Sequence, residues 1–254
     1  MTPAEQGRII AKARLAGDRL EAWPGEKPAS LADAYALQEE MVAAMGADRV
    51  GWKVGVTSRA AREALGLAAP IYGPLFAPSV VDSPARLAAG PEDLRIVEAE
   101  IAFRMGSDIA PGSVSPEALA RAIATVHPVI ELVGKRGPGG TAEAVEWVVA
   151  DGGFNAGLAV GPGSPFDNAL VLGEETVTVE IDGTRVAEGR GDNVDTGPFG
   201  VALWLAQALD ARGLGLRAGQ IVSTGLTTPV VVAEPGQEVT ARFSTLGEVR
   251  LTLG

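Results

Sequence analysis

Short apolar runs alternate with glycine and proline from Val50 onward, and this alternation limits what the chain can fold into. Runs of about four to eight residues between such breaks are typical of β-strands. Asp182-Gly183 separates two of these runs and predicts a two-residue hairpin turn. The runs predict strands at residues 50–56, 94–105, 126–133, 156–161, 175–181, 184–188, 220–224, 229–233, 238–244 and 248–253.

The first fifth of the chain has a helical pattern instead. Pro3 and a partial apolar stripe predict a helix over 3–21. Ser30, followed three residues later by an aspartate, resembles a capping box and predicts a second helix that stops at Gly46. Beyond it, helices are expected only at residues 58–65, 116–124 and 198–212.

The composition favours one irregular, sheet-rich fold. The 254 residues, 46% of them hydrophobic, are enough for a substantial core. The 33 glycines favour a curved, mixed sheet over a doubly wound one, and no G-x-G-x-x-G motif opens a helix after a strand. We therefore expect an α+β fold forming one continuous unit, with a helical N-terminal part at residues 1–48 and a β-rich part at residues 49–254.

Single counts exclude or disfavour several classes of function. No cysteine is present, which excludes disulfides, zinc–thiolate sites and iron–sulfur clusters. A formal net charge of -11 argues against a nucleic-acid partner. No apolar run approaches the roughly 20 residues of a membrane span, and the N-terminus does not resemble a signal peptide, so we expect a cytoplasmic protein with no membrane partner. His127 is the single histidine, so a mechanism that needs two histidines is impossible.

The segment VEAEIAFRMG at residues 97–106 places two glutamates in one expected strand. Side chains alternate faces along a strand, so Glu98 and Glu100 point the same way while their apolar neighbours face the core. A rise of ~3.3 Å per residue separates the two by about 6.5–7 Å. This spacing suits two ligands of one cation. It also suits two acids on a solvated strand edge, which the spacing alone favours.

A third glutamate changes this balance. Glu131 lies in the apolar run HPVIELV, where an isolated carboxylate would be costly to bury. Three converging carboxylates would raise one another's pKa, and a hard divalent cation such as Mg²⁺, Mn²⁺ or Ca²⁺ removes that conflict. Neutralisation by Arg104 or Arg136 is the competing structural explanation.

Lys53 lies in the segment GWKVGVTS, between Gly51 and Gly55 in an apolar run. Glycines in a strand allow a ligand to approach the backbone closely. A lysine there can bind a substrate carboxylate or take part in proton transfer. It can also be a strand-end lysine that extends to water, and the residues alone leave both interpretations open.

Six segments, in this order, resemble one known family: GWKVGVTS, VEAEIAF, HPVIELV, VADGGFNAGLAVG, PFGVALWLAQAL and GQIVSTGLTTPV. They are similar to the 2-oxopent-4-enoate (2-hydroxypentadienoate) hydratases and the related 4-oxalocrotonate decarboxylases of the fumarylacetoacetate hydrolase superfamily. The resemblance covers nearly the whole chain. It implies a mixed β-roll core like the C-terminal part of fumarylacetoacetate hydrolase, a helical N-terminal part, bound Mg²⁺ or Mn²⁺, and a homo-oligomer.

The resemblance also implies roles for individual residues. The active-site lysine of the family corresponds to Lys53, as a catalytic and substrate-binding residue. Asp151 and Thr224 are expected to bind substrate. The metal-binding glutamates of the family correspond to Glu98, Glu100 and Glu131. Residues 49–254 would then form the metal-binding catalytic part.

The activity that the resemblance implies is a metal-dependent hydro-lyase reaction on a small molecule. Water would add to a 2-hydroxy-2,4-dienoate of the 2-oxopent-4-enoate type and give a 4-hydroxy-2-oxo acid, in aromatic-compound catabolism. Decarboxylation of 4-oxalocrotonate, or another C–C lyase or hydrolase reaction on the same metal cage, is the alternative. A non-catalytic 2-oxo-acid binding protein is a further one. A hydrolase of this superfamily uses a histidine–glutamate pair, and His127 alone is available.

The sequence departs from the family pattern around the expected substrate. Ile71 stands where the family commonly has an acid, and Gly134-Lys135 stand where it has Asp-Ser before Arg136. Thr224 replaces a serine. We therefore expect the metal cage to be kept while the substrate, or the fate of its enolate, can differ. His127 shares the parity of the third glutamate but is expected to be a packed or rim residue.

Overall fold

The computed structural model describes residues 1–88, 95–139 and 145–254. Helix α1 (Pro3–Ala16) begins after Thr2, whose hydroxyl accepts a hydrogen bond from the backbone N–H of Glu5. It ends at Gly17, which takes a left-handed conformation with φ 70°. The predicted helix over 3–21 is therefore too long, because the glycine cap terminates it before Asp18.

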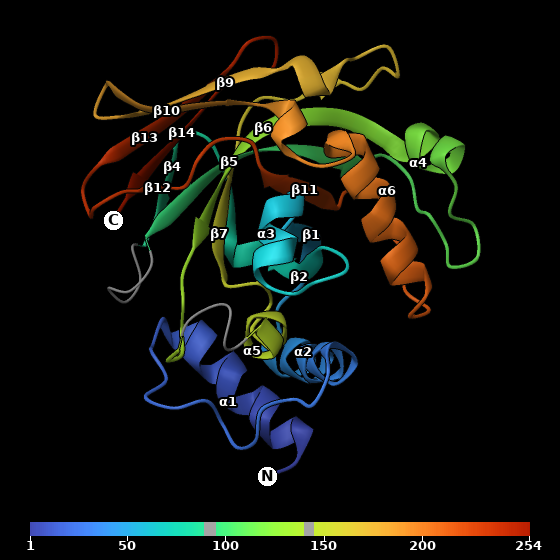
Figure 1. The fold of residues 1–254 in the computed structure, drawn as a ribbon, viewed down its shortest axis with the longest axis vertical. Helices are drawn as coiled ribbons and strands as arrows, with labels where there is room; N and C mark the ends of the chain where they lie inside the picture. Colours follow the sequence, from blue (N-terminus) through green and yellow to red (C-terminus); the bar gives the residue numbers. More distant parts are fainter. Residues whose placement is uncertain (89–94, 140–144) are drawn as a thin grey trace.

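Helix α2 (Leu31–Met45) begins after Ser30 and ends at Gly46, as predicted. It packs with α1 and with the short helix α5 (Val145–Ala150), which the sequence did not predict. Figure 1 shows these three helices together at one end of the molecule, below the sheets. Ile10, Met41 and Trp147 form part of the apolar contact between them.

The larger sheet is mixed and has nine strands in the described part of the chain. Strand β1 pairs in parallel with β11, and β3 pairs in parallel with β7, while the other pairs are antiparallel. The order is β2-β1-β11-β5-β6-β7-β3, with β12 beside β5 and β8 beside β6. The strands are β1 (Arg49–Gly55), β2 (Ile71–Phe76), β3 (Val80–Asp82), β5 (Ile96–Met105), β6 (Ile123–Val133), β7 (Asn155–Val160), β8 (Ser164–Pro165), β11 (Ile221–Leu226) and β12 (Val231–Val232).

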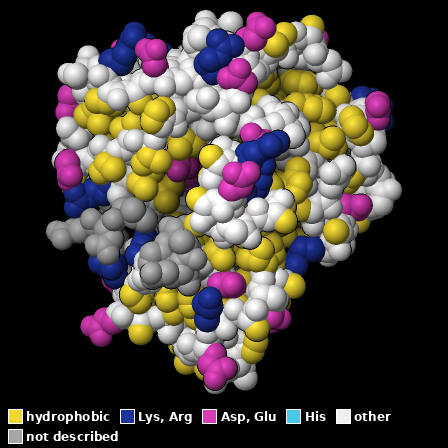
Figure 2. Space-filling model, in the orientation of Figure 1, with side chains coloured by type: hydrophobic (Ala, Val, Ile, Leu, Met, Phe, Trp, Pro, Cys, Tyr) yellow, Lys and Arg dark blue, Asp and Glu magenta, His cyan; other side chains and the backbone are white. Residues whose placement is uncertain are grey.

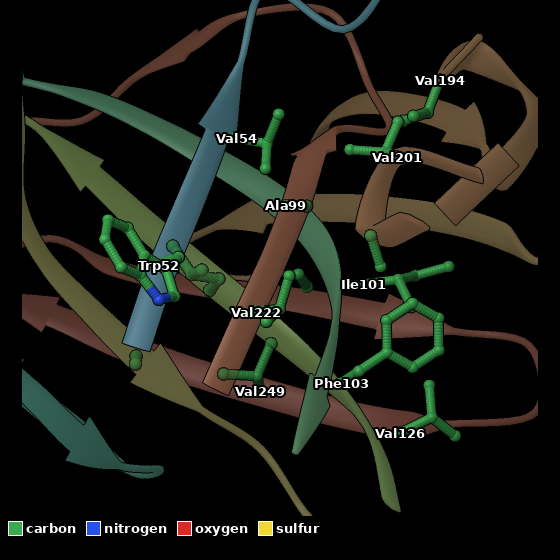
Figure 3. Close-up of a cluster of buried hydrophobic side chains, with 14 of the residues drawn as sticks. Trp52, Val54, Ala99, Ile101, Phe103, Val126, Val194, Val201, Val222 and Val249 are labelled. Carbon is green, nitrogen blue, oxygen red and sulfur yellow. The ribbon is translucent and has the colours of Figure 1, made fainter. Parts of the chain in front are cut away.

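A second sheet, with five strands among the residues that the structure describes, packs against the first in the order β10-β9-β13-β14-β4. The predicted hairpin turn at Asp182-Gly183 joins two of its strands, and both turn residues have positive φ values of 48° and 77°. Figure 3 shows side chains from both sheets meeting in the core, among them Phe103 and Val249. The strands are β4 (Ala85–Leu87), β9 (Thr176–Ile181), β10 (Thr184–Arg190), β13 (Glu238–Phe243) and β14 (Gly247–Leu253).

Helix α6 (Gly197–Asp210) covers part of this core through Val201 and Leu205. The helix predicted at 116–124 is two residues too long, because the chain passes directly from α4 into β6 at Ile123. The remaining helices are α3 (Arg59–Ala64), α4 (Pro116–Ala122) and three 3₁₀ turns at Ala77–Ser79, Leu172–Glu174 and Gly191–Asn193.

Strand β2 was not predicted, since its sequence IYGPLF contains a glycine and a proline. It lies at the edge of the larger sheet. A proline such as Pro74 has no backbone N–H to donate, and an edge strand tolerates this better than a central strand. The strand predicted over 94–105 begins at Ile96, and Leu94 lies outside the described residues. Strands β3, β4 and β8 were not predicted, because strands of two or three residues are too short to form a recognisable apolar run.

The predicted α+β fold, a mixed β-rich core with a helical N-terminal part, is confirmed. The division at residues 1–48 and 49–254 stays a prediction. Within the described ranges, no helix has both the length and the apolar character that crossing a membrane requires. On the face drawn in Figure 2, acidic and basic side chains are interspersed rather than gathered by sign.

Candidate metal centre

Strands β5 and β6 bring three glutamates together. Glu98 and Glu131 are direct partners in the antiparallel register, and Glu100 follows on the same face of β5. One carboxylate oxygen of each lies within 4.8 Å of the others. The opposite face of β5 is buried in the core between the sheets, as the alternation predicts.

Glu100 is fully buried and held through one of its two oxygens. The hydroxyl of Ser223 and the backbone N–H of Gly225, 2.9 Å away, both donate to its Oε2. A side chain cannot replace the glycine, because its φ is +99° and a Cβ there would lie 2.2 Å from Oγ1 of Thr57. Oε1 of Glu100 has no hydrogen-bond partner among the described residues.

Glu131 is also fully buried and has two partners. The side-chain nitrogen of Asn155 donates to its Oε1 at 2.9 Å, and Lys53 Nζ lies 3.3 Å from its Oε2. Lys53 also donates to the carbonyl of Gly153 at 3.2 Å. A Cβ on Gly55 or Gly153 would lie within 3.2 Å of the lysine side chain, so glycine leaves room for it.

Burial and mutual repulsion disturb the ionisation of these groups. Burial raises the pKa of Glu98 to about 7, with Glu131 adding to the rise and Lys53 opposing it. Burial, followed by the charges of Glu131 and Glu98, raises the pKa of Glu100 well above its ordinary value. Burial lowers the pKa of Lys53, but the three carboxylates outweigh it and the net shift is upward. The protein alone therefore does not fully compensate the charges of Glu98 and Glu100.

The donor set fits a hard divalent cation. All three groups offer carboxylate oxygen, and cations of the Mg²⁺ and Ca²⁺ type, with oxygen ligands at about 2.0–2.6 Å, span oxygens about 4–5 Å apart. The free oxygen of Glu100 is a buried acceptor that such a cation would satisfy. The competing explanation, neutralisation by arginine, has no support in the contacts: Arg104 donates to the Gly219 carbonyl and Arg136 pairs with Asp151.

A pocket of about 510 Å³ opens beside Glu98. Its polar lining comes from Thr57, Ser58, Asn193 and Thr228, and none of its described lining residues is lysine or arginine. Val56, in the same lining, has φ 58°, which is unusual for a β-branched residue and stores backbone strain next to the carboxylates. The pocket offers a small substrate an apolar and hydroxyl-rich space next to a cation site.

Comparison with known proteins identifies the family of the chain. The sequence profile of the fumarylacetoacetate (FAA) hydrolase C-terminal family matches residues 57–253, which include all three glutamates. The chain belongs to this family. The predicted resemblance is thereby confirmed. Lys53 lies just before the matched region.

Members of the FAA hydrolase family with assigned activities are similar over most of the chain. A TodF product hydratase of Pseudomonas putida F1 is 32% identical over 224 residues, which cover 85% of this chain and 81% of the relative. A 4-oxalocrotonate decarboxylase of a Pseudomonas species is 27% identical over 245 residues, 94% of this chain and 93% of the relative. The solved 4-oxalocrotonate decarboxylase of Pseudomonas putida G7, complexed with magnesium and adipate, superposes with a TM-score of 0.86 at 26% identity over 99% of this chain and 97% of that one.

The other predicted site residues of this FAA hydrolase family member are not at the carboxylates. The Thr224 hydroxyl donates to the Ile101 carbonyl at 2.7 Å. The Asp151 carboxylate is buried against two arginines. His127 bonds through its ring to Thr125 and Gly161, and burial lowers its pKa. Substrate binding by Asp151 and Thr224 stays a prediction.

Two contributors to the site were missed by the sequence reasoning. Asn155 is a single amide in the apolar run FNAGLAV, which is the same signal that identified Glu131. Ser223 precedes the predicted Thr224 by one position, and strand parity alone could not choose between them without the register of β11 against β5.

Proposed function

We propose that this chain is a divalent-metal-dependent hydratase that adds water to a 2-hydroxy-2,4-dienoate of the 2-oxopent-4-enoate type. The convergence of three carboxylates beside a pocket whose described lining contains no lysine or arginine carries this proposal. The all-oxygen donor set supports Mg²⁺ or Mn²⁺. The name of the hydratase relative and the magnesium in the related solved structure support the same activity and cofactor.

In the proposed enzyme, Glu98, Glu100 and Glu131 hold the cation. When bound, the cation supplies Lewis-acid polarisation of the substrate's oxygen atoms. Lys53 neutralises and positions the substrate carboxylate, or relays a proton, from its buried place 3.3 Å from Glu131. The pocket next to Glu98 receives the diene.

The proposed reaction balances with the dienoate and water as its reactants. The substrate gives up its enol O–H proton while a proton is added at C5, which leaves a 2-oxo-3-enoate. Water then adds across C3 and C4, with the hydroxyl on C4 and the proton on C3. The product is a 4-hydroxy-2-oxo acid, and the reaction has a place in aromatic-compound catabolism.

Decarboxylation of 4-oxalocrotonate is the second candidate, favoured by a related solved structure that covers nearly the whole chain. That substrate has a second carboxylate at the end opposite the oxo acid. No described residue that lines the pocket is a lysine or arginine to pair with it. The lining therefore favours the monocarboxylate. A hydrolase is disfavoured because His127 is bonded to Thr125 and Gly161 and is not at the carboxylates.

The test incubates Mg²⁺- or Mn²⁺-loaded protein with 2-hydroxypenta-2,4-dienoate and, separately, with 4-oxalocrotonate. Loss of the conjugated chromophore reports turnover. We expect metal-dependent turnover of the first substrate to 4-hydroxy-2-oxopentanoate. Release of CO₂ from the second alone would identify a decarboxylase, and binding of oxalate through the metal without any turnover would identify a binding protein. A homo-oligomer and a cytoplasmic location are also proposed, and sedimentation tests the former.

A further inference from the structure

A buried group of charges lies behind the carboxylates and has no place in the proposed reaction. The Asp151 carboxylate lies 2.7 Å from Arg136 and 3.5 Å from Arg14. The two arginine side chains are 10% and 5% exposed, and the aspartate side chain is fully buried. Two cations thus share one anion, which leaves an excess positive charge inside the protein.

Both arginines continue from Asp151 to one backbone carbonyl. Arg136 donates to the carbonyl of Asn155 at 2.8 Å, and Arg14 donates to the same oxygen at 3.1 Å. Arg14 belongs to helix α1, whereas Asn155 begins strand β7, so these bonds join the helical N-terminal part to the larger sheet. Arg14 also donates to the Asp151 carbonyl at 2.6 Å.

The side chain of Asn155 completes the connection to the candidate metal centre. It is fully buried, and its nitrogen donates to Glu131 Oε1 at 2.9 Å and to the Gly157 carbonyl at 3.3 Å. Both partners are acceptors, so the amide must present its N–H₂ group to them. The orientation of Glu131 is therefore fixed by an amide whose own backbone is fixed by two arginines.

We infer that Asn155 is a positioning residue that orients Glu131 for cation binding, and that Arg14 of helix α1, with Arg136, holds Asn155 in that position. The inference rests on the proposed cation site. Partners that orient a metal ligand typically change metal affinity by about 10–100-fold when they are removed. Glu131 and the arginines are also electrostatically linked: burial and Arg136 lower the pKa of Arg14 to about 10, while Asp151 and Glu131 oppose the shift.

The test measures Mn²⁺ affinity of the full-length chain by titration calorimetry and by the electron paramagnetic resonance signal of free Mn²⁺. We expect Asn155→Ala to weaken Mn²⁺ binding about 10–100-fold, and Arg14→Met to weaken it several-fold. The double variant should lose less Mn²⁺ binding free energy than the sum of the two single losses, because both residues act through Glu131. Arg14→Lys should restore part of the affinity, since it keeps a donor and the charge.

Gln38→Ala is the matched control. Gln38 is also a fully buried amide that joins a helix, α2, to the rest of the fold by two side-chain hydrogen bonds, to the Tyr72 and Val149 carbonyls. Its loss should lower thermal stability about as much as Asn155→Ala and leave Mn²⁺ affinity unchanged.

The two possible failures give different results. If the wild type binds Mn²⁺ while Asn155→Ala and Arg14→Met keep its affinity and lose only stability, as Gln38→Ala does, the positioning role is wrong. If the wild type itself binds no Mn²⁺, the proposed cation site is wrong, and the inference falls with it. Should Asn155→Ala not fold, Arg14→Met decides the question by the same measurement.

Discussion

Glu98 and Glu131 are direct cross-strand partners on β5 and β6, so two acids occupy a position where like charges destabilise a sheet. The register places them together although either could have faced solvent elsewhere in the fold. The burial that raises the pKa of Glu98 to about 7 increases this cost. We therefore expect a bound cation to stabilise this pair.

Removal of one ligand tests this directly. Glu100→Gln keeps the shape of the side chain but removes its charge, and we expect Mn²⁺ affinity to fall at least about 100-fold, with folding retained. Glu100→Ala should also abolish metal binding without unfolding the chain. The control is Glu175→Gln, which alters a buried acid bound to Ser244 and Thr245, away from the site. Calorimetry measures both, and unchanged affinity in the Glu100 variants would refute the cage.

The raised glutamate pKa values predict how stability depends on pH. The folded-state pKa is about 7 for Glu98 and well raised for Glu100, against roughly 4.3 for an exposed glutamate. Between these pH values the folded state therefore binds more protons than the unfolded state. The stability that comes from this proton binding is fully present below about pH 4 and is lost as pH rises through 7. We expect the free energy of unfolding without metal to fall by about 1 kcal/mol or more between pH 5 and 8. Urea denaturation measures it, and the variant with both Glu98→Gln and Glu100→Gln should show a flatter profile.

Lys53 and the cation are predicted to compete for the same carboxylates. Lys53→Met removes a positive charge 3.3 Å from Glu131, so Mn²⁺ affinity should stay the same or rise several-fold. Turnover of the dienoate should nevertheless fall about 100-fold or more, the range of a lost proton-transfer group. Loss of metal binding together with turnover would show that the lysine supports the cage instead of the chemistry.

Gly225 is predicted to be irreplaceable for a steric reason. A Cβ at this position would lie 2.2 Å from Thr57 Oγ1, in a backbone conformation with φ +99°. Gly225→Ala should therefore lower the free energy of unfolding by more than the roughly 1–2 kcal/mol of the left-handed conformation alone. Gly219→Ala is the control, because φ there is +81° but a Cβ would meet no atom within 4 Å. Urea denaturation should show the smaller loss for Gly219→Ala, and equal losses would contradict the steric explanation.

The lack of lysine and arginine in the described pocket lining predicts a change of substrate preference. Ala61 on α3 lines the pocket, so Ala61→Lys adds a cation that can pair with the second carboxylate of 4-oxalocrotonate. The ratio of kcat/KM for 4-oxalocrotonate over 2-hydroxypenta-2,4-dienoate should rise several-fold, about 1 kcal/mol. Ala64→Lys, on the exposed side of the same helix, should leave the ratio unchanged. An equal ratio in both variants would show that the diene does not enter this pocket.

The sequence predicted those parts of the site that depend on local pattern. Strand alternation placed Glu98 and Glu100 on one face, and the apolar neighbours of Glu131 indicated a buried acid that needs a partner. The side-chain cap at Ser30 and the left-handed glycine at Gly46 likewise located α2.

Features that depend on register and distant contacts could not be predicted in this way. The β11–β5 register shifts between Ser223 and Leu226, so the hydroxyl that reaches Glu100 comes from Ser223 and not from Thr224. Arg14 looks like any other helical arginine, because its partner Asp151 is 137 positions away. Strand β2 was missed because an edge position tolerates the proline that a central strand would not.

The position of β11 between β1 and β5 determines when the site can be complete during synthesis. Glu100 and the hydroxyl that holds it are 123 positions apart, and the strand carrying that hydroxyl lies between β1 and β5. After the third glutamate has been synthesised, translation must still continue to Gly225 before the strand that binds Glu100 is present. The group of three glutamates with its Ser223 and Gly225 donors can therefore be complete only in a nearly finished polypeptide.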